Sequence, residues 1–400
     1  MFSRHKSKIS QKGVVMETEN VLLTCLLICI LIAPPVLAQE PMYKSFPVPI
    51  RIDFGYCVES SLYIKCKSKD YESTFTQFLS QESGPRESAF QELVLALREK
   101  NLPACLQLTF REPLLSEKET LEYNKHIEEM MNRFSKFFDS SLLGENFEKL
   151  RITNQFFIGT EALFICGVDS PSSVSSEPFR TVYKFEANAE NEFLWKPIDG
   201  RPSALTILLR ESVERRVKSP ERFQAIENAT FDYKFPIPGT IEGDAAYLQF
   251  NGKVYDCNIF EDSVDPSDKI MSFYQRAYHV LRDKSIEDFV QFYTSKSREK
   301  YMEWLTGKNK DYAKWYHEDL LQSGLKVVFI LDAKPFYFVF YRKNHTRDKA
   351  IRFADVVLDP TDNKLKLTNF YYFDHVHEFL NSKELFINPM LKPLIKDKLK

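Results

Sequence analysis

Two stretches of this sequence, 184 positions apart, are closely similar. "LREKNLPACLQLT" begins at Leu97 and "LRDKSIEDFVQFY" begins at Leu281, and Leu, Arg, Lys and Gln recur at matching positions in both. Self-similarity with so long a period indicates a duplicated structural unit. The chain is therefore expected to build one fold twice.

Further matches keep the same order in both parts of the chain. The paired segments are 43–49 with 233–238, 61–66 with 252–257, 156–166 with 329–339, and 179–199 with 351–374. They predict a first α+β repeat over residues 39–231 and a second over residues 232–400. Chance similarity between two unrelated α+β domains is the alternative.

In the second repeat, the sequence predicts a hairpin followed by helices. Asn251-Gly252 lies between two runs of alternating polarity, and Asn-Gly favours the positive φ angles of a tight turn. Apolar residues at 273, 277 and 281 have helical spacing, and Ser285 is placed to cap the next helix. Further helices are expected over 299–305 and 312–323, before Gly324.

Consecutive strands then follow. The strand-like segments are 326–332, 335–342, 350–358 and 364–373. Helices followed by a run of strands indicate an α+β unit with a mostly antiparallel sheet. The strand "FYFVFY" at 336–341 is apolar on both faces, so something other than its own helices must cover one face. We expect the two repeats to cover each other, as a pseudo-dimer within one chain.

These segments resemble a known family. A helix ending in "LRDKS" and followed by "IEDFVQFYT" resembles the start of nuclear transport factor 2-like domains, which are cones of helices packed on a curved sheet. "FRTVYKF" and "NEFLWKPID" resemble their last strands, with Trp195, Lys196 and Ile198 in the closing positions. The hairpins expected at 50–66 and 245–259 lie outside the family pattern. The resemblance implies a concave pocket between helices and sheet in each repeat.

Members of this family include isomerases and cyclases as well as non-catalytic binding domains, so the fold alone does not choose a function. The enzymes place an acid or a histidine in the pocket to move protons. His279 is matched by Leu95 in the first repeat, and Asp199 and Asp374 are expected to cap or turn the chain. No catalytic residue is therefore predicted. The alternative is an enzyme whose single site, in the second repeat, uses His279 or His317.

Other sites were sought among the histidines, glycines and cysteines. His375 and His377 would share one face of a strand, but no third metal ligand lies nearby, so neither a metal nor a cofactor is predicted. The chain has no glycine-rich phosphate loop and no nucleophile elbow. Cys57 and Cys66 have a spacing that a small loop disulfide would close in an oxidising compartment. Cys105 and Cys166 are expected to be buried thiols.

The N-terminal residues have the pattern of an export signal. Residues 21–38 are uncharged, follow a basic segment, and contain Pro34-Pro35 before a small-residue site. This pattern predicts a signal peptide over 1–38, cleaved between Ala38 and Gln39, and hence a secreted or periplasmic protein. An uncleaved membrane anchor is the alternative, because the apolar run is almost long enough to span a bilayer.

Charge excludes one class of partner. Loss of residues 1–38 removes four basic and two acidic residues, which moves the net charge from −2 to −4. A mildly acidic chain has no electrostatic basis for binding nucleic acid. The sequence predicts an exported, non-enzymatic protein that binds a small apolar ligand or a protein partner. A single-pocket enzyme of isomerase, cyclase or hydrolase type, or a membrane-anchored envelope protein, is the alternative.

Overall fold

The structure is a computed structural model. It describes residues 40–52, 56–71, 74–80, 83–110, 116–139, 150–168, 180–196, 203–218, 230–237, 244–343, 352–359, 361–368, 376 and 380. Residues 41–400 form one compact unit. The expected signal peptide, with its cleavage site at Ala38 and Gln39, lies outside the described residues.

The N-terminal half, from β1 to α6, begins with a hairpin and continues with helices and then strands. Its hairpin pairs β1 (Met42–Ile52) with β2 (Tyr56–Asp70) in antiparallel fashion. The helices are α2 (Phe75–Leu79), α3 (Pro85–Arg98), α4 (Leu102–Gln107) and α5 (Glu117–Asp139). The later elements are β3 (Leu150–Ile158), β4 (Glu161–Val168), β5 (Arg180–Ala187), β6 (Phe193–Trp195) and α6 (Ala204–Lys218).

The C-terminal half, from β7 to β12, has its described elements in the same order. It begins with β7 (Tyr233–Pro236) and β8 (Tyr247–Asn258). The helices are α8 (Lys269–Asp283), α9 (Ile286–Val290), α10 (Ser295–Thr306) and α11 (Lys310–Ser323). The strands are β9 (Leu325–Ala333), β10 (Phe336–Lys343), β11 (Arg352–Asp359) and β12 (Lys364–Thr368). The predicted helices and strands are confirmed where the structure describes them; β12 ends at Thr368, and the rest of the strand predicted over 364–373 lies outside the described residues.

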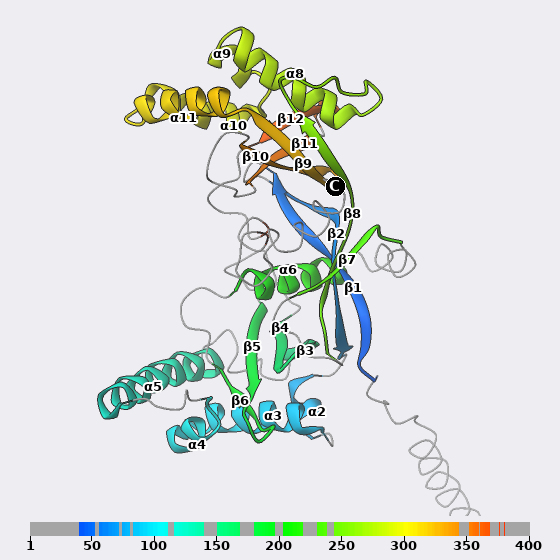
Figure 1. Ribbon diagram of the computed structural model, residues 1–400. Helices are drawn as coiled ribbons and strands as arrows, with labels where there is room; N and C mark the ends of the chain where they lie inside the picture. Colours follow the sequence, from blue (N-terminus) through cyan, green and yellow to red (C-terminus); the bar gives the residue numbers. More distant parts are fainter. Residues whose placement is uncertain are drawn as a thin grey trace, which may run out of the picture. The chain divides into compact units, whose positions relative to one another are not determined.

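All twelve described strands belong to one antiparallel sheet (Figure 1). Ten of them follow the order β12-β11-β10-β9-β8-β2-β3-β4-β5-β6, while β1 pairs with β2 and β7 pairs with β8. The halves meet where β2 pairs with β8, with Ile64 opposite Leu248. An α+β fold with an antiparallel sheet is therefore confirmed.

Local capping explains where the helices of the C-terminal half begin and end. Asp268 caps α8 by accepting the N–H of Met271, and Ser285 caps α9 by accepting the N–H of Asp288, as predicted. α11 ends before Gly324, whose φ of 67° suits glycine. These signals are local, which is why the sequence reveals them.

The hairpin expected at Asn251-Gly252 is wrong. β8 runs without a turn from Tyr247 to Asn258 and pairs with both β2 and β9. A Cβ on Gly252 would lie 2.4 Å from the ring of Phe329 and 2.7 Å from the carbonyl oxygen of Ile330. Glycine is needed here for close packing within the sheet, not for a turn.

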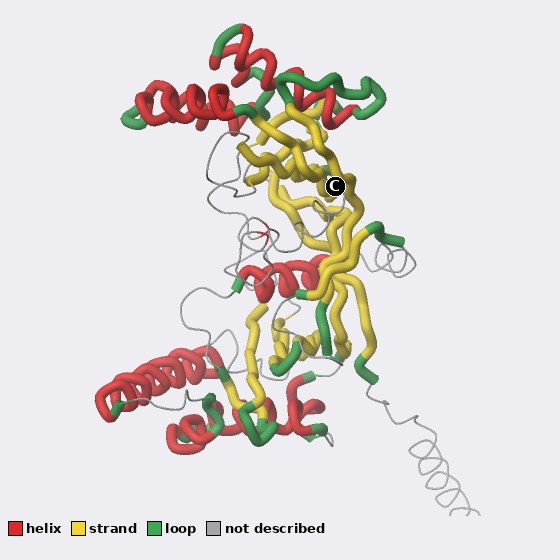
Figure 2. Tube along the Cα trace, in the orientation of Figure 1, coloured by secondary structure: helices red, strands yellow, loops and turns green. Residues whose placement is uncertain are grey.

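Three apolar cores surround the sheet. Helices α2–α5 pack on β3–β6, helices α8–α11 pack on β9–β12, and a central core lies on the opposite faces of the same strands. Figure 2 shows α8–α11 gathered together against their strands. Along β10, Phe336, Phe338 and Phe340 belong to the central core, whereas Val339 and Tyr341 face the helices. The prediction that both faces of this strand are covered is confirmed, and the central core draws residues from both halves.

Candidate functional site

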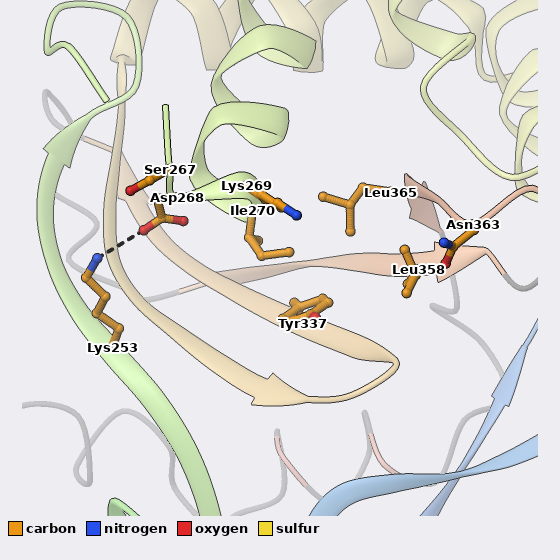
Figure 3. Close-up of a pocket in the computed structure, with 9 residues that line it drawn as sticks. All are labelled: Lys253, Ser267, Asp268, Lys269, Ile270, Tyr337, Leu358, Asn363 and Leu365. Carbon is orange, nitrogen blue, oxygen red and sulfur yellow. Dashed lines mark hydrogen bonds and ion pairs between the residues drawn. The ribbon is translucent and has the colours of Figure 1, made fainter. Parts of the chain in front are cut away.

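A pocket of about 690 Å³ lies between the start of α8 and strands β10–β12, and we call it the α8 pocket (Figure 3). Its apolar lining consists of Ile270, Tyr337, Leu358 and Leu365. Its polar lining consists of Lys253, Ser267, Asp268, Lys269 and Asn363. The volume is in the range of small-molecule binding sites.

The polar wall is built around the carboxylate of Asp268. The hydroxyl of Tyr255 donates a hydrogen bond to it at 2.5 Å, and the ammonium of Lys253 lies 3.1 Å from the same oxygen. The other oxygen accepts the N–H of Met271 at 3.1 Å. Burial of this carboxyl opposes ionisation, but the bonds from Tyr255, Met271 and Lys253 outweigh it and lower its pKa. Asp268 is therefore a firmly held carboxylate and a poor proton acceptor.

The N-terminal half holds a matching cluster. Lys69 and Tyr71 stand 184 positions before Lys253 and Tyr255. The carboxylate of Glu87 accepts from Lys69 at 2.9 Å and from the Tyr71 hydroxyl at 3.0 Å. In each cluster the lysine ammonium also lies about 5 Å from the tyrosine ring, at 5.0 Å for Lys69 and 4.9 Å for Lys253. The recurrence of a lysine and a tyrosine two residues apart, at an offset of 184 positions, is a signal of the two clusters that the sequence contains and that was not among the predicted sites.

The space next to this first cluster is filled. Arg86 lies with its guanidinium carbon 4.5 Å from the ring centroid of Phe157 and 4.7 Å from that of Phe193. It also bonds the carboxylate of Asp244 at 2.7 Å. Ile270, which lines the α8 pocket, stands 184 positions after Arg86. At this matched position, one half therefore has an arginine and the other has a shorter apolar side chain.

The two histidines considered as catalytic candidates lie outside the lining of the α8 pocket. His279 lines a smaller recess of about 320 Å³ together with Asp283. Its Nε2 lies 3.0 Å from the carbonyl oxygen of Ile259, and Arg282 binds both oxygens of Asp283 at 2.6 and 3.0 Å. His279 is thus held beside the Ile259 carbonyl, and the carboxylate in its recess is paired with Arg282.

His317 is buried among aromatic side chains. Its Nδ1 lies 2.6 Å from the carbonyl oxygen of Ala313 and its Nε2 lies 2.6 Å from the Tyr301 hydroxyl. Burial lowers the pKa of this imidazole, against the opposing effect of the Ala313 bond. The neutral ring therefore donates to Ala313 and accepts from Tyr301.

The predicted disulfide pair is not brought together. Cys57 and Cys66 both belong to β2, and nine residues of extended strand span about 30 Å, against the roughly 6 Å between the Cα atoms of a disulfide. Cys66 is a buried free thiol. Cys105 and Cys166 are buried free thiols as expected, and burial raises the pKa of Cys105 to about 11. A strand, not a loop, occupies the spacing that suggested a disulfide.

Two further predicted positions, Trp195 and Lys196, lie in or next to β6. Trp195 is buried at the end of β6, and Lys196 pairs with Glu186. His375, His377, Ile198, Asp199 and Asp374 lie outside the described residues. In the part of the chain that the structure describes, no cluster of three metal-ligating side chains occurs.

No protein-family model, curated protein or solved structure matches this chain. Among the described helices, none has the length and apolar character needed to cross a membrane.

Proposed function

We propose that the chain is an internally duplicated α+β protein in which the C-terminal half binds a small ligand without catalysis. The duplication is supported by matching element bounds. α3 and α8 begin 184 positions apart, β3 and β9 begin and end 175 positions apart, and β5 and β11 begin and end 172 positions apart. The mirrored strand order on either side of β2 and β8 supports a pseudo-dimer of the two repeats.

Equivalent backbone hydrogen bonds in the two halves also support the duplication. Trp195 exchanges backbone hydrogen bonds with Leu108 and Phe110, and Leu367 exchanges the equivalent bonds with Phe292 and Thr294. These are parallel bridges between the last described strand of each half and the segment that follows a short helix, α4 in the N-terminal half and α9 in the C-terminal half. In each half, helices are followed by the strands of the sheet, which is the order expected of nuclear transport factor 2-like domains. We therefore keep the resemblance to that family as part of the proposal.

The observation that carries the binding function is the lining of the α8 pocket. Four apolar side chains form one part of it, and Lys269 is exposed at its edge in the first turn of α8. Lys269 has no ion-pair partner among the described residues. Figure 3 shows its ammonium directed over the apolar lining toward Leu365. An apolar molecule with one acidic group fits this arrangement, with its acid near Lys269 and its body against Tyr337 and Leu358.

An enzymatic role is less well supported at this site. The carboxylate in the lining, Asp268, is already bonded by three donors and has a lowered pKa, whereas a general base works best with a pKa near the working pH. Neither His279 nor His317 belongs to the lining.

Export remains part of the proposal, on the strength of residues 1–38. Cleavage before Gln39 would leave a secreted or periplasmic protein, whereas retention of residues 21–38 would give a membrane-anchored one. The mass of the protein recovered from its own cells distinguishes the two, since a chain beginning at Gln39 excludes the anchor.

The binding proposal is tested with decanoate as the acidic probe and decylamine as the control of equal length and opposite charge. Calorimetry should show that decanoate binds the full chain and that decylamine binds more weakly. Lys269→Gln should weaken decanoate binding by about fivefold, as expected for a partly exposed ion pair. Equal binding of both probes, or no effect of Lys269→Gln, would contradict the assigned ligand class.

A further inference from the structure

The N-terminal end of α11 carries two large aromatic side chains in solvent. Tyr312 is 58% exposed and Trp315 is 55% exposed, and their ring centroids are 5.6 Å apart. Trp304 contacts Tyr312 at 6.2 Å and the buried Tyr301 at 5.3 Å, so a chain of rings connects the exposed pair to the core. The pair is thus held in place by the fold, and Figure 1 shows this end of α11 pointing away from the sheet.

Lysines surround the exposed rings. Lys308, Lys310 and Lys314 are all exposed within the same short segment, which contains Asp311 as its one acidic residue between Gly307 and Tyr316. Lys308 and Lys310 make no ion pair with any described residue. Lys314 lies 3.9 Å from Glu318, and this pair is too exposed to neutralise the lysine strongly. We call Tyr312, Trp315 and these three lysines the aromatic tip.

We infer that the aromatic tip docks on an anionic lipid surface. Trp and Tyr favour the headgroup region of a bilayer, because one part of each ring system is apolar and the other is polar. Lysines near such a surface are attracted by anionic headgroups. The inference is independent of the α8 pocket, because the residues of the tip and those of the pocket lining are different.

The size and charge of the tip favour lipid over a protein partner. A stable protein interface buries about 800 Å² on each partner, and two half-exposed rings supply only a small part of that area. The N-terminal half provides a control for exposed apolar surface. Leu121 on α5 is 71% exposed, but it is not aromatic and the charges around it are of both signs, with Lys118 3.8 Å from Glu122.

The test uses the full chain with vesicles of equal parts phosphatidylcholine and phosphatidylglycerol, and with pure phosphatidylcholine vesicles. Lipids brominated in their acyl chains quench tryptophan fluorescence only at close range, so they report whether Trp315 itself reaches the bilayer. This local signal is not produced by the apolar segment 21–38, which contains no tryptophan.

We expect quenching with the anionic vesicles, its loss in Trp315→Phe, and blue-shifted emission in the unsubstituted chain. Replacing Lys308 and Lys310 by Gln should weaken the interaction by about fivefold per lysine. Leu121→Ser should change nothing. Each of these surface variants should keep the native circular dichroism spectrum.

Three results would overturn the inference. They are no quenching of Trp315, equal quenching by neutral and anionic vesicles, and quenching that is insensitive to the lysine substitutions. Sedimentation velocity tests whether the tip instead contacts a second copy of the chain. A concentration-dependent dimer that is lost in Trp315→Ser would assign the tip to a second copy of the chain and overturn the lipid assignment.

Discussion

Each half of the molecule holds a lysine, a tyrosine and a carboxylate together, in different surroundings. In the N-terminal half, the Lys69 side chain is only 13% exposed beside Glu87, and Arg86 fills the neighbouring space. In the C-terminal half, the Lys253 side chain is 66% exposed beside Asp268, and the neighbouring space is the α8 pocket. The comparison teaches that a cluster serving as a closed structural element in one half forms the wall of an open pocket in the other.

The largest expected effect comes from breaking the closed cluster. Glu87→Gln leaves the ammonium of Lys69 largely buried without its counter-charge, which should lower the free energy of unfolding by about 3 kcal/mol. Urea denaturation monitored by circular dichroism measures this change. A loss below about 1 kcal/mol would mean that the N-terminal cluster is no more structural than the open one.

A somewhat smaller effect is expected at Gly252 in β8, the strand through which the C-terminal half pairs with β2. Gly252→Ala forces a Cβ against Phe329 and the carbonyl oxygen of Ile330, and should cost about 2 kcal/mol. Thermal unfolding is the appropriate measurement. A neutral or stabilising result would contradict the close approach of Phe329 and Ile330 to Gly252.

A substitution in the open cluster should cost less than its counterpart in the closed one. Asp268→Asn keeps a side chain able to cap α8 and leaves Lys253 free to be hydrated, so a loss of about 1 kcal/mol is expected. Urea denaturation of Asp268→Asn gives the loss of unfolding free energy that is compared with the loss in Glu87→Gln. Equal losses for the two substitutions would remove the proposed distinction between the halves.

The smallest expected effect is on how the free energy of unfolding depends on pH. Burial opposes ionisation of Glu87, but Lys69 and the other donors outweigh it, so its pKa is lowered in the folded protein. The stabilisation is present above the unfolded pKa of about 4.3 and is lost as pH falls through the folded value. Glu87→Gln should therefore flatten the acid limb of the stability profile, as measured by denaturation between about pH 6 and pH 3. A variant with an unchanged slope would show that Glu87 does not contribute to it.

The sequence predicted the elements whose signals are local. The Ser285 cap, the apolar spacing along α8 and the run β9–β12 follow from neighbouring residues, and each is confirmed. Asn251-Gly252 misled because its turn preference is local, whereas the close approach of Phe329 comes from the neighbouring strand β9. The disulfide expected for Cys57 and Cys66 failed for a similar reason, since β2 continues through both positions.

The α8 pocket could not be predicted in this way. Its polar wall needs a carboxylate from α8 to meet a lysine and a tyrosine from β8, and the repeat alignment did not include that carboxylate as a matched position. Its apolar lining brings Ile270 of α8 together with side chains of β10, β11 and β12, which lie far away in the sequence. The pairing of Lys69 and Tyr71 with Lys253 and Tyr255 was readable at the 184-residue offset, and it would have directed attention to this region.

The most direct test places in the C-terminal half the side chain that fills the N-terminal half. Ile270→Arg should occupy the α8 pocket and abolish decanoate binding in calorimetry, while the melting temperature stays within a few degrees of the unsubstituted chain because the position is partly exposed. Loss of binding with a preserved fold is the predicted result. Undiminished binding to a folded Ile270→Arg variant would contradict the claim that this pocket is the binding site.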